Sequence, residues 1–208
     1  MSQATLDPVT VKKVPSSSPQ GAPTFGRYTE IPTNQLTKEQ QEGYRAFQMV
    51  EGDGSPTLPG PLKIWLNNPA LTLAVAPLAT HFRPTHHTLT TREREIIVCM
   101  VAGKSHSPFA TNAHAEILEG LGVSTEQTEA LTTNRPTSFT DPGEQLVYDI
   151  AVTVLNSQWV PRTLYDRAVK TFGHDKICDV LVLMGMYTAI SLTVAFYDVA
   201  AGEKGLQR

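Results

Sequence analysis

Apolar residues recur every three or four positions along most of the chain, which is the spacing of one face of an α-helix. The clearest runs are QQEGYRAFQMV at 40–50, NPALTLAVAPLATHFR at 68–83, REREIIVCMVAG at 92–103 and SPFATNAHAEILEGLG at 107–122. No stretch shows the strict alternation of a half-buried strand over any useful length. The pattern predicts an all-α protein, a compact bundle of about eight or nine helices.

Capping signals predict where these helices begin and end. Capping boxes, a Ser or Thr followed three residues later by Glu or Gln, occur at Thr37, Thr90 and Ser124. Asn68 and Ser107 each precede a proline, the arrangement of an N-cap followed by N1. Further boundaries are expected at Asp141 and Pro161 for helix starts, and at the GDG of 52–54, Gly103, Gly120 or Gly122, and Gly173 for helix ends. Inside the run at 68–83, Pro77 predicts a kink or a break.

The last apolar run, residues 180–197, contains eighteen uncharged residues between Asp179 and Asp198. That length reaches the lower limit for a membrane-spanning helix. Polar residues inside the run and the lack of Lys or Arg beside it favour a central helix buried by neighbouring helices or by partner subunits. We therefore expect no membrane span.

The length of 208 residues is typical of one domain. Residues 1–24 are rich in Pro, Ser and Gly and lack the apolar segment of a secretion signal, so we expect a disordered tail there and the helical domain over 25–208. The net charge of −3, from 17 basic and 20 acidic residues, gives no field that would recruit nucleic acid. Cys99 and Cys178 match neither a disulfide framework nor a CxxC motif, which favours a reducing, cytoplasmic location.

One carboxylate and one imidazole are expected to meet across the turn at 103–106. Glu95 lies eight residues before Gly103, and His114 lies eight residues after His106. At about 1.5 Å per residue, each lies about 12 Å from the turn, so the two are level in an antiparallel helix pair.

His114 shares a helix face with Ala110, Ile117 and Leu118, so its ring is expected to enter an apolar interior. Apolar surroundings would raise the pKa of Glu95, and a histidine bound to it can transfer protons near neutral pH. The alternative is a satisfied core histidine, with Glu95 paired to the nearby Arg92.

Residues 89–124, LTTREREIIVCMVAGKSHSPFATNAHAEILEGLGVS, resemble the core motif of the carboxymuconolactone decarboxylase family and the related alkyl hydroperoxidase D group. The resemblance covers the chain from about residue 25 to its C-terminus and is most specific over 83–122. It implies a helical bundle that assembles as a homo-oligomer, a trimer or a hexamer, and that works on a small-molecule substrate without a cofactor.

In the redox branch of these proteins a glutamate precedes the first cysteine of CxxC by twelve residues, and a histidine follows the second cysteine by four. Counted onto this chain, the positions fall on Glu95, Ser107, Ala110 and His114. Both thiols are missing, and neither Ser nor Ala can carry a thiol peroxidase cycle. Non-redox relatives often carry an acidic residue and a tryptophan where this chain has Ala110 and Thr111, which leaves their chemistry open here.

Arg83 matches an arginine that precedes the core helices of the family, and it can hold a substrate carboxylate or form a surface ion pair. His81, His86 and His87 lack a metal-ligand spacing, so we expect no metal.

The remaining candidate substrate-binding residues are Ser107, Phe109, Trp65 and Tyr187. Ser107 before Pro108 is explained by capping alone. Trp65 and Tyr187 either line an apolar pocket or belong to the core.

The sequence thus favours a cofactor-independent lyase of the decarboxylase type, acting on a small unsaturated carboxylated or lactone-type metabolite. In this scheme Arg83 orients a carboxylate, His114 transfers a proton and Glu95 orients His114. Two alternatives stay open: an isomerase or cyclase that uses the same residues, and a non-catalytic ligand-binding or scaffold oligomer.

Overall fold

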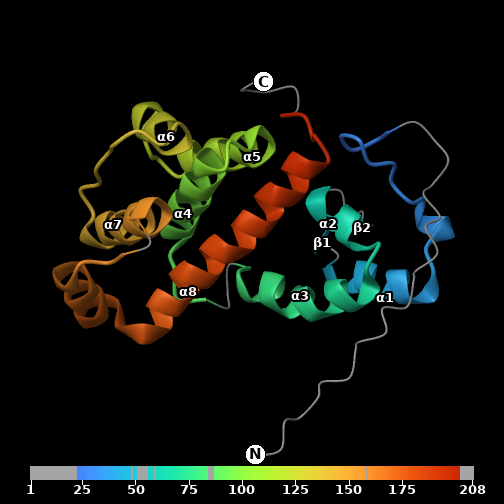
Figure 1. Cartoon of the computed structure of the whole chain (residues 1–208), viewed down its shortest axis with the longest axis horizontal. Coiled ribbons are helices and arrows are strands. Elements are labelled where there is room, and N and C mark those ends of the chain that lie inside the picture. The colour runs from blue at the N-terminus through green and yellow to red at the C-terminus, as the bar shows by residue number, and fades with distance from the viewer. Residues whose placement is uncertain are drawn as a thin grey trace, which may run out of the picture.

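The computed structural model describes residues 23–47, 49–50, 56–58, 60–83, 87–157 and 159–201. Within this part of the chain the fold is built from eight α-helices and one short 3-10 helix, Thr33–Gln35 (Figure 1). The all-helical fold predicted from the sequence is confirmed. The tail expected at 1–24 lies almost wholly outside the described residues. The helices are α1 (Lys38–Phe47), α2 (Gly60–Trp65), α3 (Pro69–His81), α4 (Thr91–Lys104), α5 (Pro108–Gly120), α6 (Thr125–Thr132), α7 (Pro142–Ser157) and α8 (Arg162–Phe196).

The predicted capping boxes are present. Thr90 and Ser124 each accept a bond from the third backbone N–H of the helix that follows, and Glu93 and Gln127 return the bond. Thr37 and Gln40 do the same before α1, over 3.0 and 3.2 Å. Satisfying the free N–H groups of a first turn stabilises each helix start by about 1 kcal/mol.

Four local predictions need correction or comment. Ser107 occupies the N-cap position of α5, but its side chain makes no capping bond. The helix α3 continues through Pro77 without a break. Gly173 does interrupt the last helix, with φ 71° and ψ 173° inside α8. The GDG at 52–54 lies outside the described residues, and a short antiparallel ribbon flanks it that the sequence did not predict, Met49–Val50 paired with Pro56–Thr57.

Helix α4 is the centre of the fold. Its residues from Glu95 to Gly103 are all buried, and it packs against α5, α6, α7 and α8. A helix enclosed on every side must be apolar all round, which explains why Ile96, Ile97 and Val98 follow one another. The main hydrophobic core forms around this helix.

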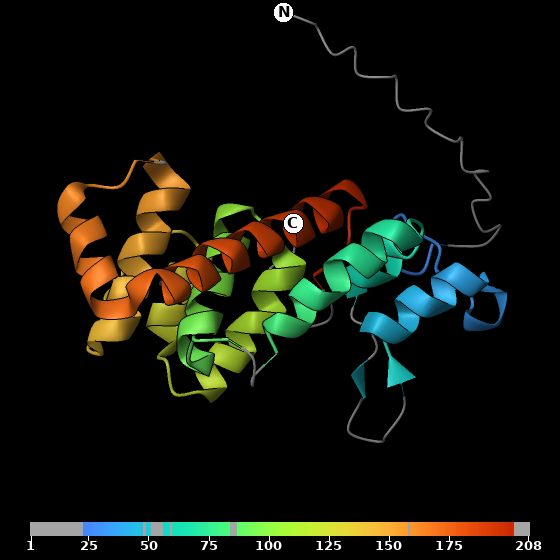
Figure 2. The same ribbon diagram turned by 90° about the horizontal axis from the view of Figure 1, so that it is seen from below.

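A second, smaller hydrophobic cluster lies among α1, α2 and α3, and includes Phe47, Leu58 and Ala76. Figures 1 and 2 show these helices at one end of the molecule and α4 to α7 at the other, with α8 extending across both. Through this arrangement α8 joins the two clusters into one molecule.

Helix α8 has one buried face and one exposed face. Val180, Leu183 and Val194 are at most 2% exposed, whereas Leu192 and Phe196 are 67% and 76% exposed. The helix is long and apolar enough to cross a membrane, and 39% of its apolar window is buried within the protein. The burial expected on all sides is therefore absent within a single chain.

The contact between α4 and α6 generates a test of packing. A Cβ on Gly103 would lie 2.6 Å from the backbone oxygens of Leu131 and Thr132, and backbone atoms cannot move aside cheaply. We expect Gly103→Ala to destabilise the protein by about 1 to 3 kcal/mol and to lower its melting temperature accordingly, measured by circular dichroism.

The matched control is Gly120→Ala, because a Cβ there meets nothing within 4 Å. That variant should melt at an unchanged or slightly higher temperature, since alanine is the better helix former. Equal destabilisation by both substitutions would contradict the packing argument.

Candidate active site

The expected contact between Glu95 of α4 and His114 of α5 is present. The Oε2 atom of Glu95 lies 2.6 Å from Nδ1 of His114. The Glu95 side chain is fully buried, and the His114 side chain is 15% exposed. Counting residues from the turn therefore predicted the level of both groups correctly. Their catalytic role stays a prediction.

Two polar partners compensate the carboxylate of Glu95 within the buried core. Arg94 forms an ion pair with its Oε1 atom, so both oxygens have a cationic or N–H partner. Arg92 does not take this part, because Glu144 of α7 binds it at 2.5 and 3.0 Å. The alternative pairing of Glu95 with Arg92 was therefore wrong.

Tyr187 of α8 closes the site from a third helix. Its ring lies edge-on to the His114 ring, with 5.1 Å between the centroids. The Nη2 atom of Arg94 lies 3.5 Å from the Tyr187 hydroxyl. Burial raises the pKa of Tyr187 to about 12, so its hydroxyl keeps its proton at neutral pH.

The bond to Glu95 determines what His114 can do. An ionised carboxylate only accepts hydrogen bonds, so Nδ1 of His114 must carry the proton that it donates. In the neutral ring Nε2 then keeps its lone pair, and the described residues offer it no hydrogen-bond partner. The arrangement presents a base at Nε2 whose ring is held in place by Glu95.

Of the candidate substrate-binding residues, Tyr187 contacts the pair, whereas Ser107 shares only its helix face. Ser107 is two turns before His114 on the same face of α5, and its buried Oγ has no hydrogen-bond partner among the described residues. Phe109 lies on the opposite face of α5, where its ring packs edge-on against Phe25 at 5.4 Å.

Two other candidates lie elsewhere. Arg83 donates a hydrogen bond of 3.2 Å to the backbone oxygen of Phe47 on α1. Trp65 lines an apolar hollow of about 410 Å³ between α3 and α8. Two residues of α8 that line this hollow, Gly185 and Ala189, lie on the face opposite Tyr187.

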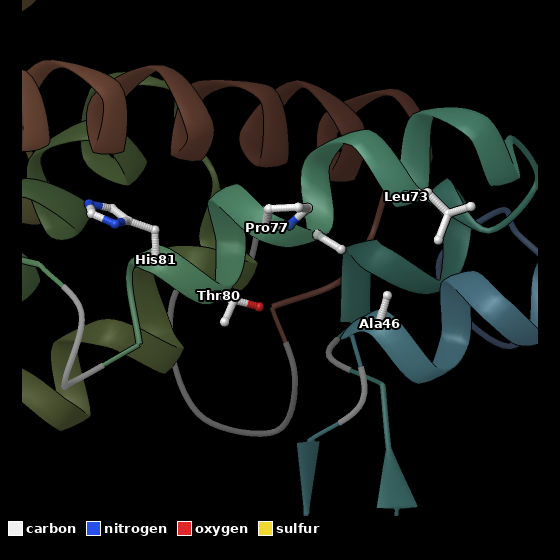
Figure 3. A pocket seen from close by; sticks show the side chains of 6 residues that line it. Ala46, Leu73, Pro77, Thr80 and His81 are labelled. Carbon is white, nitrogen blue, oxygen red and sulfur yellow. The ribbon is translucent and has the colours of Figure 1, made fainter.

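A second hollow, of about 540 Å³, runs along α3 from Leu73 to His81, with Ala46 of α1 across from it (Figure 3). It does not include the Glu95–His114 pair. These hollows and the chemically distinctive residues therefore lie in different places.

Two of the three histidines considered as metal ligands, His81 and His87, have protein partners. His81 binds Asp179 at 2.7 Å, and Nδ1 of His87 accepts a bond of 3.2 Å from the backbone N–H of Leu89. Burial alone would raise the pKa of Asp179, but bonds from Thr88 and His81 outweigh it and lower that pKa. His86 lies outside the described residues, and in the part that is described no group of three potential ligands is suited to a metal ion.

Arg94 is the residue of this site that the sequence analysis missed. Consecutive helix residues do not face each other, so the pattern gave no reason to pair Arg94 with Glu95. The available signal was the cost of burying Glu95, which requires a compensating cation nearby.

Comparisons with known proteins bear on the fold. No family model matches the chain, and no curated protein matches it. Among solved structures, an uncharacterized peroxidase-related protein from Silicibacter sp. TM1040 aligns with a TM-score of 0.64 at 16% identity, covering 86% of this chain and 94% of that one. The debrominase Bmp8 in complex with 2,3,4-tribromopyrrole aligns with a TM-score of 0.59 at 14% identity, covering 84% and 91%.

This chain has their fold. The identities of 16% and 14% are too low to show more than this shared architecture, and they leave the activity open.

The two cysteines generate a prediction about thiol chemistry. Cys99 is fully buried, and burial raises the pKa of its thiol far above neutrality, whereas Cys178 is exposed. We expect one fast-reacting thiol per chain in the native protein and two after unfolding, counted with a thiol reagent and mass spectrometry. The Cys178→Ser variant should show no fast-reacting thiol.

Neither thiol has a resolving partner, so no thiol-dependent turnover of an organic hydroperoxide is expected. Such turnover by the purified protein would show that the positions of the missing thiols were assigned wrongly.

Proposed function

We propose that the protein is a cofactor-independent lyase of the decarboxylase type, acting on a small unsaturated carboxylated or lactone-type metabolite. The observation that carries this proposal is the buried carboxylate–imidazole pair, in which Glu95 holds Nδ1 of His114 and leaves Nε2 available. The sequence resemblance to carboxymuconolactone decarboxylases supplies the reaction type.

The pair suits a reaction that needs one proton moved to or from carbon. When a carboxylate leaves as carbon dioxide, the electron pair of the broken bond stays on the substrate and is delocalised into its unsaturated system. A protonated His114 then donates its Nε2 proton to that carbon, and Nε2 is afterwards reprotonated by solvent. Glu95 stabilises the imidazolium and keeps the ring oriented throughout.

An isomerase or cyclase is the second candidate, because the same base can remove a proton at one carbon and return it at another. The presence of Ala110, where related non-redox proteins often carry an acid, favours a chemistry that needs only the Glu95–His114 pair. The debrominase among the structural neighbours supports an enzymatic role for this fold. A cytoplasmic protein without nucleic-acid partners fits the charge and the cysteines.

A panel of small lactones, keto acids and carboxylated dienes tests the proposal. Mass spectrometry distinguishes loss of carbon dioxide from a product of unchanged mass, which would indicate isomerisation or cyclisation. A panel in which no compound is converted would contradict the enzymatic proposal and favour the scaffold alternative.

The coupling of Glu95 and His114 gives a quantitative prediction. His114→Gln and Glu95→Gln should each lower turnover by about 100- to 10,000-fold, the usual contribution of general acid–base catalysis. Because both substitutions disable the same step, the double variant should be little worse than the poorer single variant.

The matched control is His106→Gln, since His106 is exposed in the turn before α5 and contributes nothing to the pair. It should keep its turnover. If both single variants of the pair stay active while melting at a markedly lower temperature, the pair is structural and the active site lies elsewhere.

We also propose that the protein is a homo-oligomer, a trimer or a hexamer. The exposed face of α8 carries Leu192 and Phe196, which are 67% and 76% exposed, and monomeric proteins rarely leave such an apolar face in water. Light scattering should give a multiple of the chain mass of 22.7 kDa at micromolar concentration.

Phe196→Glu should shift this assembly towards monomer, because a charge in an apolar interface is costly. Trp159→Glu is the control, since Trp159 is 69% exposed but lies before α8. A monomeric wild-type protein would contradict the proposal.

A further inference from the structure

Two buried nitrogen atoms beside the Glu95–His114 pair have no hydrogen-bond partner among the described residues. They are Nε2 of His87, in the segment before α4, and Nε of Arg94, in the first turns of α4. Buried polar atoms are nearly always paired in native proteins, because an unpaired one destabilises the fold. Each such atom would therefore be satisfied by a partner that the described residues do not supply.

Both atoms are hydrogen-bond donors. The Nε atom of an arginine always carries a proton. Nδ1 of His87 accepts the backbone N–H of Leu89 at 3.2 Å, so the proton of the neutral ring is on Nε2. Burial lowers the pKa of His87, and the charge of Arg94 lowers it further, which keeps the ring neutral. The missing partner must therefore be an acceptor.

Contacts with α8 fix the positions of both donors. Asp179 of α8 accepts hydrogen bonds of 2.8 and 2.7 Å from the backbone and side chain of Thr88, the residue after His87. Two turns later on α8, the Tyr187 hydroxyl lies 3.5 Å from Arg94 Nη2. One helix thus fixes the segment that carries His87 and the side chain that carries the second donor.

The acidic groups nearby are already engaged. Glu95 is bound by Arg94 and His114, and Asp179 is bound by Thr88 and His81. Neither carboxylate is hydrogen-bonded to Nε2 of His87 or to Nε of Arg94. Two N–H groups with no protein acceptor in the described part of the chain, one of them on a charged guanidinium, are suited to a bound anion.

We propose that Nε2–H of His87 and Nε–H of Arg94 bind a carboxylate group of the substrate, beside the proton-transfer pair. A carboxylate offers two oxygens in one plane, and each can accept one of the two N–H groups. The inference rests on the proposed function and names the substrate class more closely. It also gives Arg94 the role that the sequence pattern suggested for Arg83.

The bound carboxylate is the one that stays on the substrate. A cation that pairs with a carboxylate stabilises its charged form, so loss of that same group as carbon dioxide would forfeit the interaction in the transition state. The substrate therefore carries a second group at which the reaction occurs. Dicarboxylates and carboxylated lactones or ketones have this pattern, with one group held at Arg94 and the other near His114.

Acetate is the probe, because it is a bare carboxylate, and acetamide is its uncharged control. The readout is the ¹H–¹⁵N signals of the His87 ring and of Arg94 Nε, the two groups that should donate. Two charge-assisted hydrogen bonds predict saturable shifts at both signals, with a dissociation constant on the order of millimolar. Acetamide should produce none.

Substitutions at His87 distinguish the effect of its N–H donor from the effect of its side-chain volume. His87→Phe removes the donor and should weaken acetate binding by at least about tenfold, whereas His87→Gln keeps an N–H donor and should bind more tightly than His87→Phe. Arg94→Gln should abolish the shifts, and Arg162→Gln, which removes the same charge from an exposed arginine, should leave them unchanged.

Absence of saturable shifts in the wild-type protein would overturn the proposal. Loss of acetate binding in Arg83→Gln with retention in Arg94→Gln and His87→Phe would overturn it as well, and would place the carboxylate site at Arg83. His114→Gln separates this proposal from the proposed function. It should keep acetate binding after losing turnover, so either conclusion can fail alone.

Discussion

The carboxylate of Glu95, with no exposed surface, is the constraint on which the centre of this structure depends. Burying an unpaired charge costs far more than the few kcal/mol by which a domain is stable, so its position is possible only if cations surround it. Arg94 meets one oxygen and His114 meets the other. Tyr187 contacts both of these partners, so α4, α5 and α8 all contribute to holding one ion. The same contacts that stabilise the charge also assemble the candidate site.

The architecture was largely readable from the sequence, because capping residues and helix periodicity are local signals. Thr90 with Glu93 marks the start of α4, and equal residue counts from the turn placed Glu95 opposite His114. Ser107 shows where this reasoning stops: its position before a proline is typical of a cap, yet its hydroxyl makes no capping bond. Whether a hydroxyl turns towards the helix or towards the interior depends on packing, which the local sequence does not encode.

The partners of the charged residues were not predictable in the same way. Arg92 and Arg94 are two residues apart, and either could have compensated Glu95. Glu144, which is 52 residues away in the sequence, binds Arg92 and so decides the question. The roles of His87 and Arg94 depend likewise on Asp179 and Tyr187 of α8, which the fold alone brings near. Electrostatic pairing is therefore the part of this site that required three-dimensional information.

Gly173 has a consequence for the mechanics of the molecule. The positive φ of Gly173 changes the direction of the chain at that residue. The residues from there to Phe196 then continue as one helix. Near the far end of that helix, Thr193 accepts a hydrogen bond of 2.9 Å from the Trp65 indole of α2, and Tyr187 lies six residues earlier against His114. This helix thus contacts the smaller hydrophobic cluster through Trp65 and the His114 ring through Tyr187. A displacement of α1 to α3 would therefore act on the same helix that carries the contact with the His114 ring.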